Sequence, residues 1–297
     1  MTTLRMLALF ALMLAGTAHA ARPAANALAL PPGFAAMSLD DKLDNLVRAG
    51  YDRPDEALAL LDGLRRSSAP RVWLQAAATI QAQAGRTAQA NALAEQLLAL
   101  AHDGSDPLAG AAANLVRAIV AESAGQLDVA AALAQSALEV YQANCPAGPA
   151  DPARCDHRSR WRTLQLLQQR ALGLGLLSAA SAHAGSALGA AEAADDPYRQ
   201  SLSLATLALL AAREGNQDKA DQAITRAKRR AATVDDPLLT VRVRNIEAAI
   251  ADLRGDHATT LRLTEESLAI AERANAERVS AQLRVNLTDL YAKQRRP

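Results

Sequence analysis

Two cysteines and a nearby histidine are the residues whose types and spacing could support chemistry. Cys145 and Cys155 are the only cysteines of the chain, and His157 follows two residues later. In an oxidising compartment the two thiols would form a disulfide that closes an inserted loop at 144–156, which stabilises a fold by about 3 kcal/mol through lost chain entropy. The alternative is a metal site, but two thiolates and one imidazole are one ligand short of a closed zinc site. The sequence therefore favours the disulfide and predicts no metal.

Other motifs with catalytic potential are weak. Gly173-Leu174-Gly175 resembles part of a phosphate-binding loop. No strand pattern precedes it, however, and it falls where a turn between two helices is expected. The remaining histidines are scattered, and the chain has no G-x-S-x-G, H-E-x-x-H or P-loop pattern. The sequence predicts no catalytic residues and no cofactor, so we expect a protein that is not an enzyme.

One run of basic residues has two interpretations. It contains Arg226, Lys228, Arg229 and Arg230. The first interpretation is a solvated helix C-terminus, where cations interact favourably with the helix dipole. The second is a site for an anionic partner. Lys and Arg total 32 against 31 Asp and Glu, so the chain as a whole gives no electrostatic reason to expect nucleic acid or an anionic membrane surface.

Glycines recur at a step of 40 residues, with one step of 50 that contains the cysteine loop: Gly85, Gly125, Gly175, Gly215 and Gly255. Small residues stand at fixed distances before and after these glycines: Ala78, Ala118, Ala208 and Ala248 before them, and Ala90, Ala130, Ala180, Ala220, Ala137, Ala187 and Ala227 after them. Small side chains let antiparallel helices cross closely, and glycine permits the positive φ that ends a helix. The period predicts a stack of helix pairs.

Composition and helix-start signals agree with this interpretation. Apolar residues make up 50% of the chain and aromatic residues only 3%, and no segment alternates as a half-buried strand would. Asp106-Pro107, Asp196-Pro197 and Asp236-Pro237 each provide a capping carboxylate followed by proline at a helix start. Ser38 to Asp41 has the pattern of a capping box. The chain is expected to be almost entirely helical.

The pattern of a small residue, a glycine and two later alanines resembles the tetratricopeptide repeat, in the longer variety called MalT-like. The resemblance covers residues 38–297 and implies an all-α fold, a right-handed α-solenoid of about six antiparallel helix pairs in one elongated domain. The segment from Asn286 to Pro297 matches the first helix of a repeat with no second helix after it. The last repeat is therefore expected to be incomplete.

The same resemblance implies a concave groove lined by the first helix of each pair. The family's groove positions correspond to Gln75, Thr79, Glu122, Arg162, Gln165, Gln169, Leu202, Leu209, Arg242, Asn245, Asp252, Gln282 and Asp289. A protein or peptide is the expected partner, since arginine can hold a carboxylate and amide side chains can satisfy a peptide backbone. The alternative is that these residues form ordinary solvated helix faces. Only Arg242 and Asn245 match the family's two-carboxylate clamp, so clamp activity is not expected.

The first 20 residues have the features of a secretory signal peptide. Arg5 precedes an apolar run from Met6 to Ala15, and Ala18 and Ala20 are small residues at the positions that a signal peptidase recognises. The run is too short to span a bilayer as an anchor. We therefore expect cleavage after Ala20, a loose Ala/Pro-rich leader over 21–37, and a periplasmic protein.

A second function follows from the resemblance alone. Periplasmic stacks of this kind often precede a transmembrane helix and a cytoplasmic GGDEF diguanylate cyclase domain. The chain would then be the sensory N-terminal part of a membrane-bound signalling protein, and would meet the membrane only if it continued beyond residue 297. The two possibilities differ in whether an apolar run of about 20 residues follows Pro297.

Overall fold

Helices are the only regular elements in the residues that the computed structural model describes, which are 28, 30–145 and 155–294. The predicted signal peptide and residues 21–27 and 29 of the predicted leader lie outside these residues. Two short 3-10 helices, η1 (Phe34–Ala36) and η2 (Arg65–Ser67), accompany the α-helices. The α-helices are α2 (Leu39–Ala49), α3 (Pro54–Gly63), α4 (Pro70–Gln83), α5 (Thr87–His102), α6 (Ala109–Ser123), α7 (Leu127–Ala143), α8 (His157–Gly173), α9 (Leu177–Ala193), α10 (Pro197–Arg213), α11 (Gln217–Ala231), α12 (Pro237–Leu253), α13 (His257–Arg273) and α14 (Glu277–Gln294).

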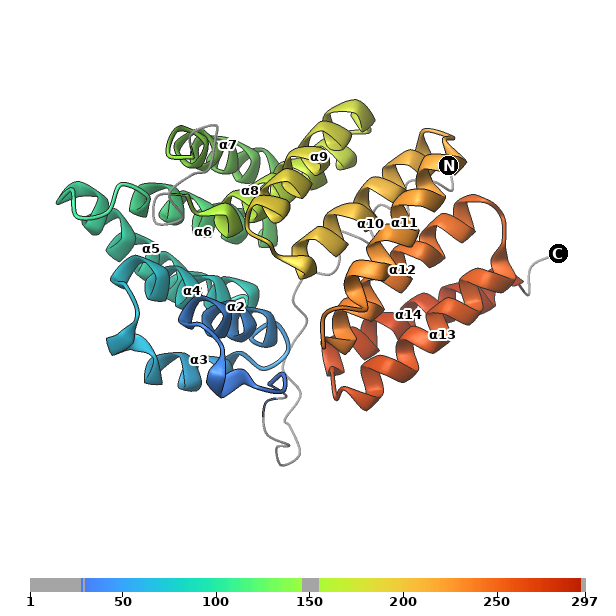
Figure 1. The fold of residues 1–297 in the computed structure, drawn as a ribbon, viewed down its shortest axis with the longest axis horizontal. Helices are drawn as coiled ribbons and strands as arrows, with labels where there is room; N and C mark the ends of the chain where they lie inside the picture. Colours follow the sequence, from blue (N-terminus) through green and yellow to red (C-terminus); the bar gives the residue numbers. More distant parts are fainter. Residues whose placement is uncertain (1–27, 29, 146–154, 295–297) are drawn as a thin grey trace. The chain divides into compact units, whose positions relative to one another are not determined.

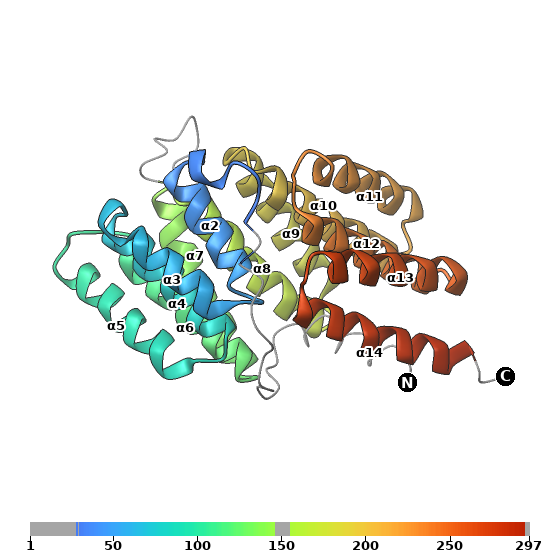
Figure 2. The ribbon, with the colours of Figure 1, turned by 90° about the horizontal axis from the view of Figure 1, so that it is seen from below.

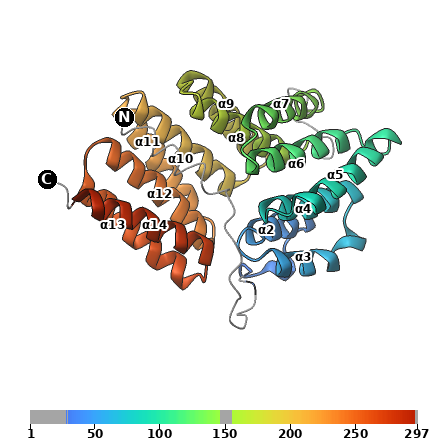
Figure 3. The same ribbon diagram turned by 180° about the vertical axis from the view of Figure 1, so that it is seen from behind.

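Within each of two compact units, helices that follow one another pack as antiparallel neighbours, which confirms the predicted all-α repeat fold (Figures 1 and 3). We call the helix before each repeat glycine helix A and the helix after it helix B; α14 follows helix B of the last pair. The chain divides into two compact units, Met1–Gly173 and Leu174–Pro297. In the first unit, α2 packs on α3, the A and B helices pack as α4/α5 and α6/α7, and α8 packs on α7. In the second unit, α9 packs on α10, the pairs are α10/α11 and α12/α13, and α14 runs beside α13 (Figure 2).

The repeat glycines end helix A in the predicted way, as the turn at Gly215 shows. Gly215 has a φ of 79°, which lies in the left-handed region. The next residue, Asn216, donates its backbone N–H to the carbonyl of Ala211 at 2.8 Å, and Gly215 donates to Ala212 at 3.1 Å. This pair of bonds satisfies two carbonyls that the helix end would otherwise leave without partners. The other four repeat glycines have φ values between 74° and 76°.

The small residues at fixed distances from the glycines lie in the helix crossings. Ala208 on α10 and Ala220 on α11 have no exposed surface. Ala227, two turns after Ala220 on the same face of α11, has none either. A larger side chain at such a crossing would have to push two helices apart, at a cost of typically 1–3 kcal/mol. Alanine at these positions therefore sets how closely helix A and helix B approach.

The helix-start predictions are confirmed at three of four places. Ser38, Asp196 and Asp236 are N-caps whose side chains accept backbone N–H bonds. The prediction for Asp106-Pro107 is wrong by two residues, because α6 begins at Ala109. There the Asp106 carboxylate accepts the N–H of Leu108 at 2.9 Å and closes a turn that precedes the helix. In the described part of the chain, no helix combines the length and apolar character that crossing a membrane requires.

Candidate functional site

The predicted groove residues of the first unit lie on the three A helices α4, α6 and α8. They are Gln75 and Thr79 on α4, Glu122 on α6, and Arg162, Gln165 and Gln169 on α8. Thr79 is buried and the other five are half-buried. Two of the six, Gln75 and Arg162, form hydrogen bonds to other side chains inside the unit.

Arg71, at the start of α4, joins the beginnings of three A helices. Its Nε donates to Asp106 at 2.9 Å, just before α6, and its Nη1 donates to Asp156 at 2.8 Å, just before α8. Asp156 also accepts the backbone N–H of Ser159 at 2.9 Å. Gln75 donates to the Ser159 hydroxyl at 2.6 Å. Charge-assisted bonds of this kind are roughly twice as strong as neutral ones, so this network fixes the first turn of α8.

A second tie reaches from α8 to the first helix of the unit. Arg158, in the first turn of α8, pairs with Asp41 in the first turn of α2. Positions 117 residues apart in sequence are thereby in direct contact. The first turn of α8 is therefore held by α2 and α4 together.

Glu122 and Arg162 form the polar centre of the same face. Burial raises the pKa of Glu122 to about 7, although the Arg162 guanidinium opposes the shift. In the amide orientation that satisfies both its neighbours, Gln83 donates to the Val47 carbonyl and accepts from Arg162, both at 3.1 Å. Gln165 differs from these residues, since its buried Nε2 has no hydrogen-bond partner among the described residues.

In the second unit the predicted apolar step of the groove lies largely in the core. Leu209 on α10 is only 2% exposed, and Leu202 is half-buried. The neighbouring positions Ala205 and Ala212 are also buried. Helix α10 is surrounded by α9, α11 and α12, which explains why its apolar residues have little surface left.

Helix α12 presents its predicted groove residues as one stripe. Arg242, Asn245 and Asp252 are half-buried, while Val241, Val243 and other residues between them are buried. The spacing of three and seven residues places all three on one helix face. Asp252 lies 3.5 Å from the imidazole of His257, at the start of α13. The stripe thus combines a guanidinium, an amide and a carboxylate on one face.

Helix α14 carries the last two predicted groove residues, on a face that is more exposed to solvent. Gln282 is half-buried and donates to Asn286 at 3.0 Å. Asp289 is exposed, one turn further along. Val285, between them, is 56% exposed. The α14 face therefore offers polar groups and an apolar side chain together.

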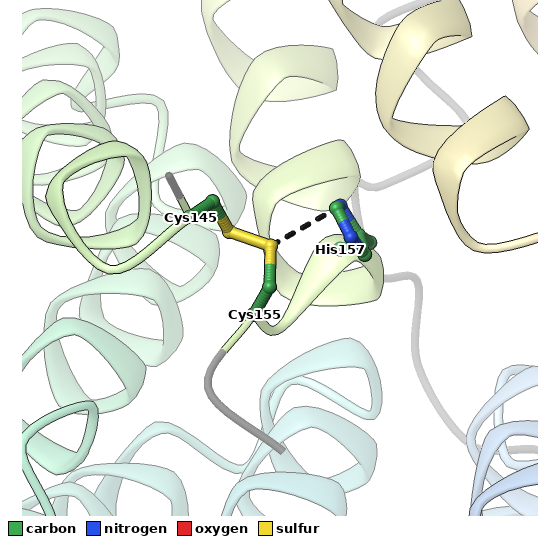
Figure 4. Close-up of side chains that lie close together, drawn as sticks. All are labelled: Cys145, Cys155 and His157. Carbon is green, nitrogen blue, oxygen red and sulfur yellow. Dashed lines mark hydrogen bonds between the residues drawn. A yellow bond between two sulfur atoms is a disulfide. The ribbon is translucent and has the colours of Figure 1, made fainter. Parts of the chain in front are cut away.

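The two cysteines form a disulfide, in agreement with the favoured interpretation (Figure 4). Cys145 follows α7 and Cys155 precedes α8, with their Cα atoms 4.8 Å apart. The Sγ of Cys155 lies 3.3 Å from the Nδ1 of His157. Burial, followed by the nearby Arg160 guanidinium, holds the pKa of His157 below its usual range. The three side chains make up the one group of potential metal ligands found among the described residues.

The basic run lies at the C-terminal end of α11, as the first interpretation predicts. Arg226, Arg229 and Arg230 are exposed, and Lys228 pairs with Glu247 of α12 at 2.7 Å. The Gly173-Leu174-Gly175 segment is a helix end and turn, with Gly175 at a φ of 74°.

Sequence reasoning missed the residues that tie the first unit together: Arg71, Gln83, Asp156 and Ser159. Asp156 did carry a signal, because Asp directly before a helical segment is a common N-cap residue. Arg71 carried none, since its two partners lie 35 and 85 residues away.

Comparison with known proteins shows a similarity of fold. No family model matches the chain, and no curated protein sequence matches it. A solved structure of a Rap protein complexed with Competence and Sporulation Factor is 15% identical, covers 86% of this chain and 72% of its own, and gives a TM-score of 0.52. BtubC from P. vanneervenii is 16% identical over 80% of this chain and 93% of its own, with a TM-score of 0.53. At such low identity these likenesses concern the fold alone, and the shared fold is a stack of helix pairs.

Proposed function

We propose that this chain is a non-catalytic repeat module that binds an extended peptide or short helix of a protein partner on α12 and α14 of the second unit. The observation that carries the proposal is the α12 stripe of Arg242, Asn245 and Asp252, half-buried on one helix face. A guanidinium can bind a carboxylate with two hydrogen bonds, and an amide can satisfy a peptide N–H and C=O. The exposed Val285 on α14 adds apolar contact area.

Two further considerations support this proposal. Stacked helix pairs create extended surfaces that commonly bind other chains. The Rap structure, which is similar in fold, was determined with Competence and Sporulation Factor bound.

The test is selection of peptides from a displayed random library on the purified chain, followed by fluorescence anisotropy with a selected peptide. Arg242→Ala combined with Asn245→Ala should weaken binding by about tenfold or more, because hydrogen bonds to charged groups contribute roughly 1.5–3 kcal/mol. Arg229→Ala combined with Arg230→Ala, on the exposed end of α11, is the matched control and should leave the affinity unchanged.

Three other outcomes would contradict the proposal or place the binding site elsewhere. A library without binders would count against a peptide-binding module. Loss of affinity only in the α11 variant would move the site to the basic run. Loss only in Gln165→Ala would move it to α8 of the first unit.

We further propose that the module works in the periplasm. The signal-peptide pattern over residues 1–20 supports this location, and so does the Cys145–Cys155 disulfide, because disulfides persist in oxidising compartments. An antibody against the repeat region, used on fractionated host cells, should detect the mature chain in the periplasm. A much larger band in the membrane fraction would instead favour the sensory part of a membrane-bound signalling protein.

A further inference from the structure

We propose that Cys145, Cys155 and His157 bind a zinc ion when the disulfide is reduced, so that the two cysteine sulfur atoms have two mutually exclusive bonding states. In one state the two sulfur atoms share a covalent bond (Figure 4). In the other they are thiolates that hold the metal together with the imidazole. This site is independent of the proposed peptide surface, which lies on helices of the other unit.

The distances among the three side chains fit a tetrahedral metal site. The Cys155 Sγ and His157 Nδ1 are 3.3 Å apart. Zinc bonds of about 2.3 Å to sulfur and about 2.0 Å to nitrogen place such a pair roughly 3.5 Å apart at the tetrahedral angle. All three ligand atoms lie within 4.8 Å of one another. Only a small adjustment at Cys155 and His157 is therefore needed.

The turn that carries two of the ligands is held in place without help from the disulfide. The His157 N–H donates to the Cys155 carbonyl at 3.1 Å. Asp156, between them, accepts bonds from Arg71 and from Ser159. These bonds persist when the disulfide opens, so Cys155 and His157 keep their relative positions. The largest movement is that of the Cys145 sulfur, which has to shift by about 2 Å to reach the sulfur separation that a shared zinc ion requires.

The donor set selects zinc over hard cations. Two thiolates and one imidazole are soft and borderline ligands, which suit Zn²⁺ and not Mg²⁺ or Ca²⁺. The Asp156 carboxylate is engaged by Arg71 and Ser159 and is not available as a fourth ligand. Cys145 and His157 are half-buried, so solvent can reach the site and a water molecule can take the fourth position.

The change between the disulfide form and the zinc-bound form conserves electrons and protons. A dithiol reductant gives two electrons and two protons to the disulfide; the S–S bond breaks, two thiols form, and the reductant becomes a disulfide. Zinc then displaces the two thiol protons, which leave to solvent. A dithiol-oxidising disulfide reverses the process, forming the Cys145–Cys155 bond and releasing the ion.

Metal titration of the reduced chain tests the proposal. The purified protein is reduced with a phosphine under anaerobic conditions and titrated with Co²⁺, which reports tetrahedral thiolate coordination by its visible and charge-transfer absorption. Zinc affinity is then measured by displacement of Co²⁺ and by competition with a chromophoric chelator. We expect one ion per chain, and none at this site in the disulfide form.

Single variants decide the ligand set. Cys145→Ser, Cys155→Ser and His157→Ala should each lower zinc affinity by at least about tenfold. His183→Ala, which removes another partly buried imidazole on α9, is the matched control and should bind zinc as the wild type does. The proposal is overturned if the reduced wild type takes up no ion, if His157→Ala binds as tightly as the wild type, or if the oxidised chain binds equally well.

Discussion

Glu122 is a half-buried carboxyl group on α6, and the loss of solvent around it raises its pKa to about 7 from an ordinary 4.5. Between these two pH values the folded chain keeps the proton while the unfolded chain has lost it. Raising the pH through this window therefore favours unfolding, and the penalty is fully present above about pH 7. We expect Glu122→Gln to remove this part of the pH dependence, which amounts to on the order of 2 kcal/mol.

Urea unfolding at a series of pH values measures this effect. The free energy of unfolding of the wild type should fall relative to that of Glu122→Gln as the pH rises from about 4.5 to about 7. Glu139→Gln, at an exposed position on α7, is the matched control and should retain the wild-type slope. Parallel curves for Glu122→Gln and the wild type would show that Glu122 is ionised in the folded chain.

Arg71 is the second residue whose removal is informative, because it neutralises Asp106 and Asp156 at once and its side chain is only 13% exposed. Arg71→Met leaves two partly buried carboxylates without their cation, which we expect to cost about 2–4 kcal/mol in the free energy of unfolding. Arg117→Met breaks a more exposed pair with Glu95 and should cost less than about 1 kcal/mol. Equal losses in denaturant unfolding would contradict a special role for the Arg71 network.

Some contacts and burial of individual residues could be predicted from the sequence, and others could not. The Cys145–Cys155 bond was predictable, because the chain has only two cysteines and its N-terminal pattern predicted an oxidising compartment. The burial of Leu209 was not, since the repeat pattern assigns it to a groove while the packing of α9, α11 and α12 around α10 covers it. The ion pair between Arg158 and Asp41 could not be predicted either, because it depends on how α8 packs near α2, and the two residues are 117 positions apart in the sequence.

Among the elements, the turn at Gly215 tests the repeat pattern directly. A Cβ built on Gly215 would meet no atom within 4 Å, so substitution causes no clash. The cost of Gly215→Val is backbone strain, since valine rarely adopts a φ of 79°. We expect a loss of about 1–3 kcal/mol and a lower melting temperature by circular dichroism.

Gly189→Val provides the matched control for this element. Gly189 also has open space around it, but it lies inside α9 and has no positive φ. Valine is no worse a helix former than glycine, so stability should stay the same or rise slightly. If Gly215→Val melted like Gly189→Val, the left-handed turn would not be what ends helix A.

The period of the glycines made these turns predictable from the sequence. The start of α6 was not predictable, because Asp106 forms a turn there in place of a cap.

At the scale of the whole molecule, the two compact units make different contributions to unfolding. The disulfide lies in the first unit, which spans Met1–Gly173. Both tryptophans of the chain, Trp73 and Trp161, also belong to that unit. Tryptophan fluorescence therefore reports on the first unit, while far-ultraviolet circular dichroism reports on the helices of both. In a stack of repeats each part is stabilised mainly by its neighbours, so local changes in stability need not spread through the chain.

We therefore expect reduction of the disulfide to separate the two signals. Opening a loop of this length should destabilise the first unit by about 3 kcal/mol, because the unfolded chain regains its entropy. With a metal chelator present, the fluorescence midpoint in urea should fall, and circular dichroism should show a second transition at the original midpoint. Cys145→Ser combined with Cys155→Ser should reproduce this behaviour without reductant. If both probes instead shifted together in the reduced chain and in the double variant, the units would unfold as one cooperative body, and the stability conferred by the α7–α8 disulfide would extend to α14.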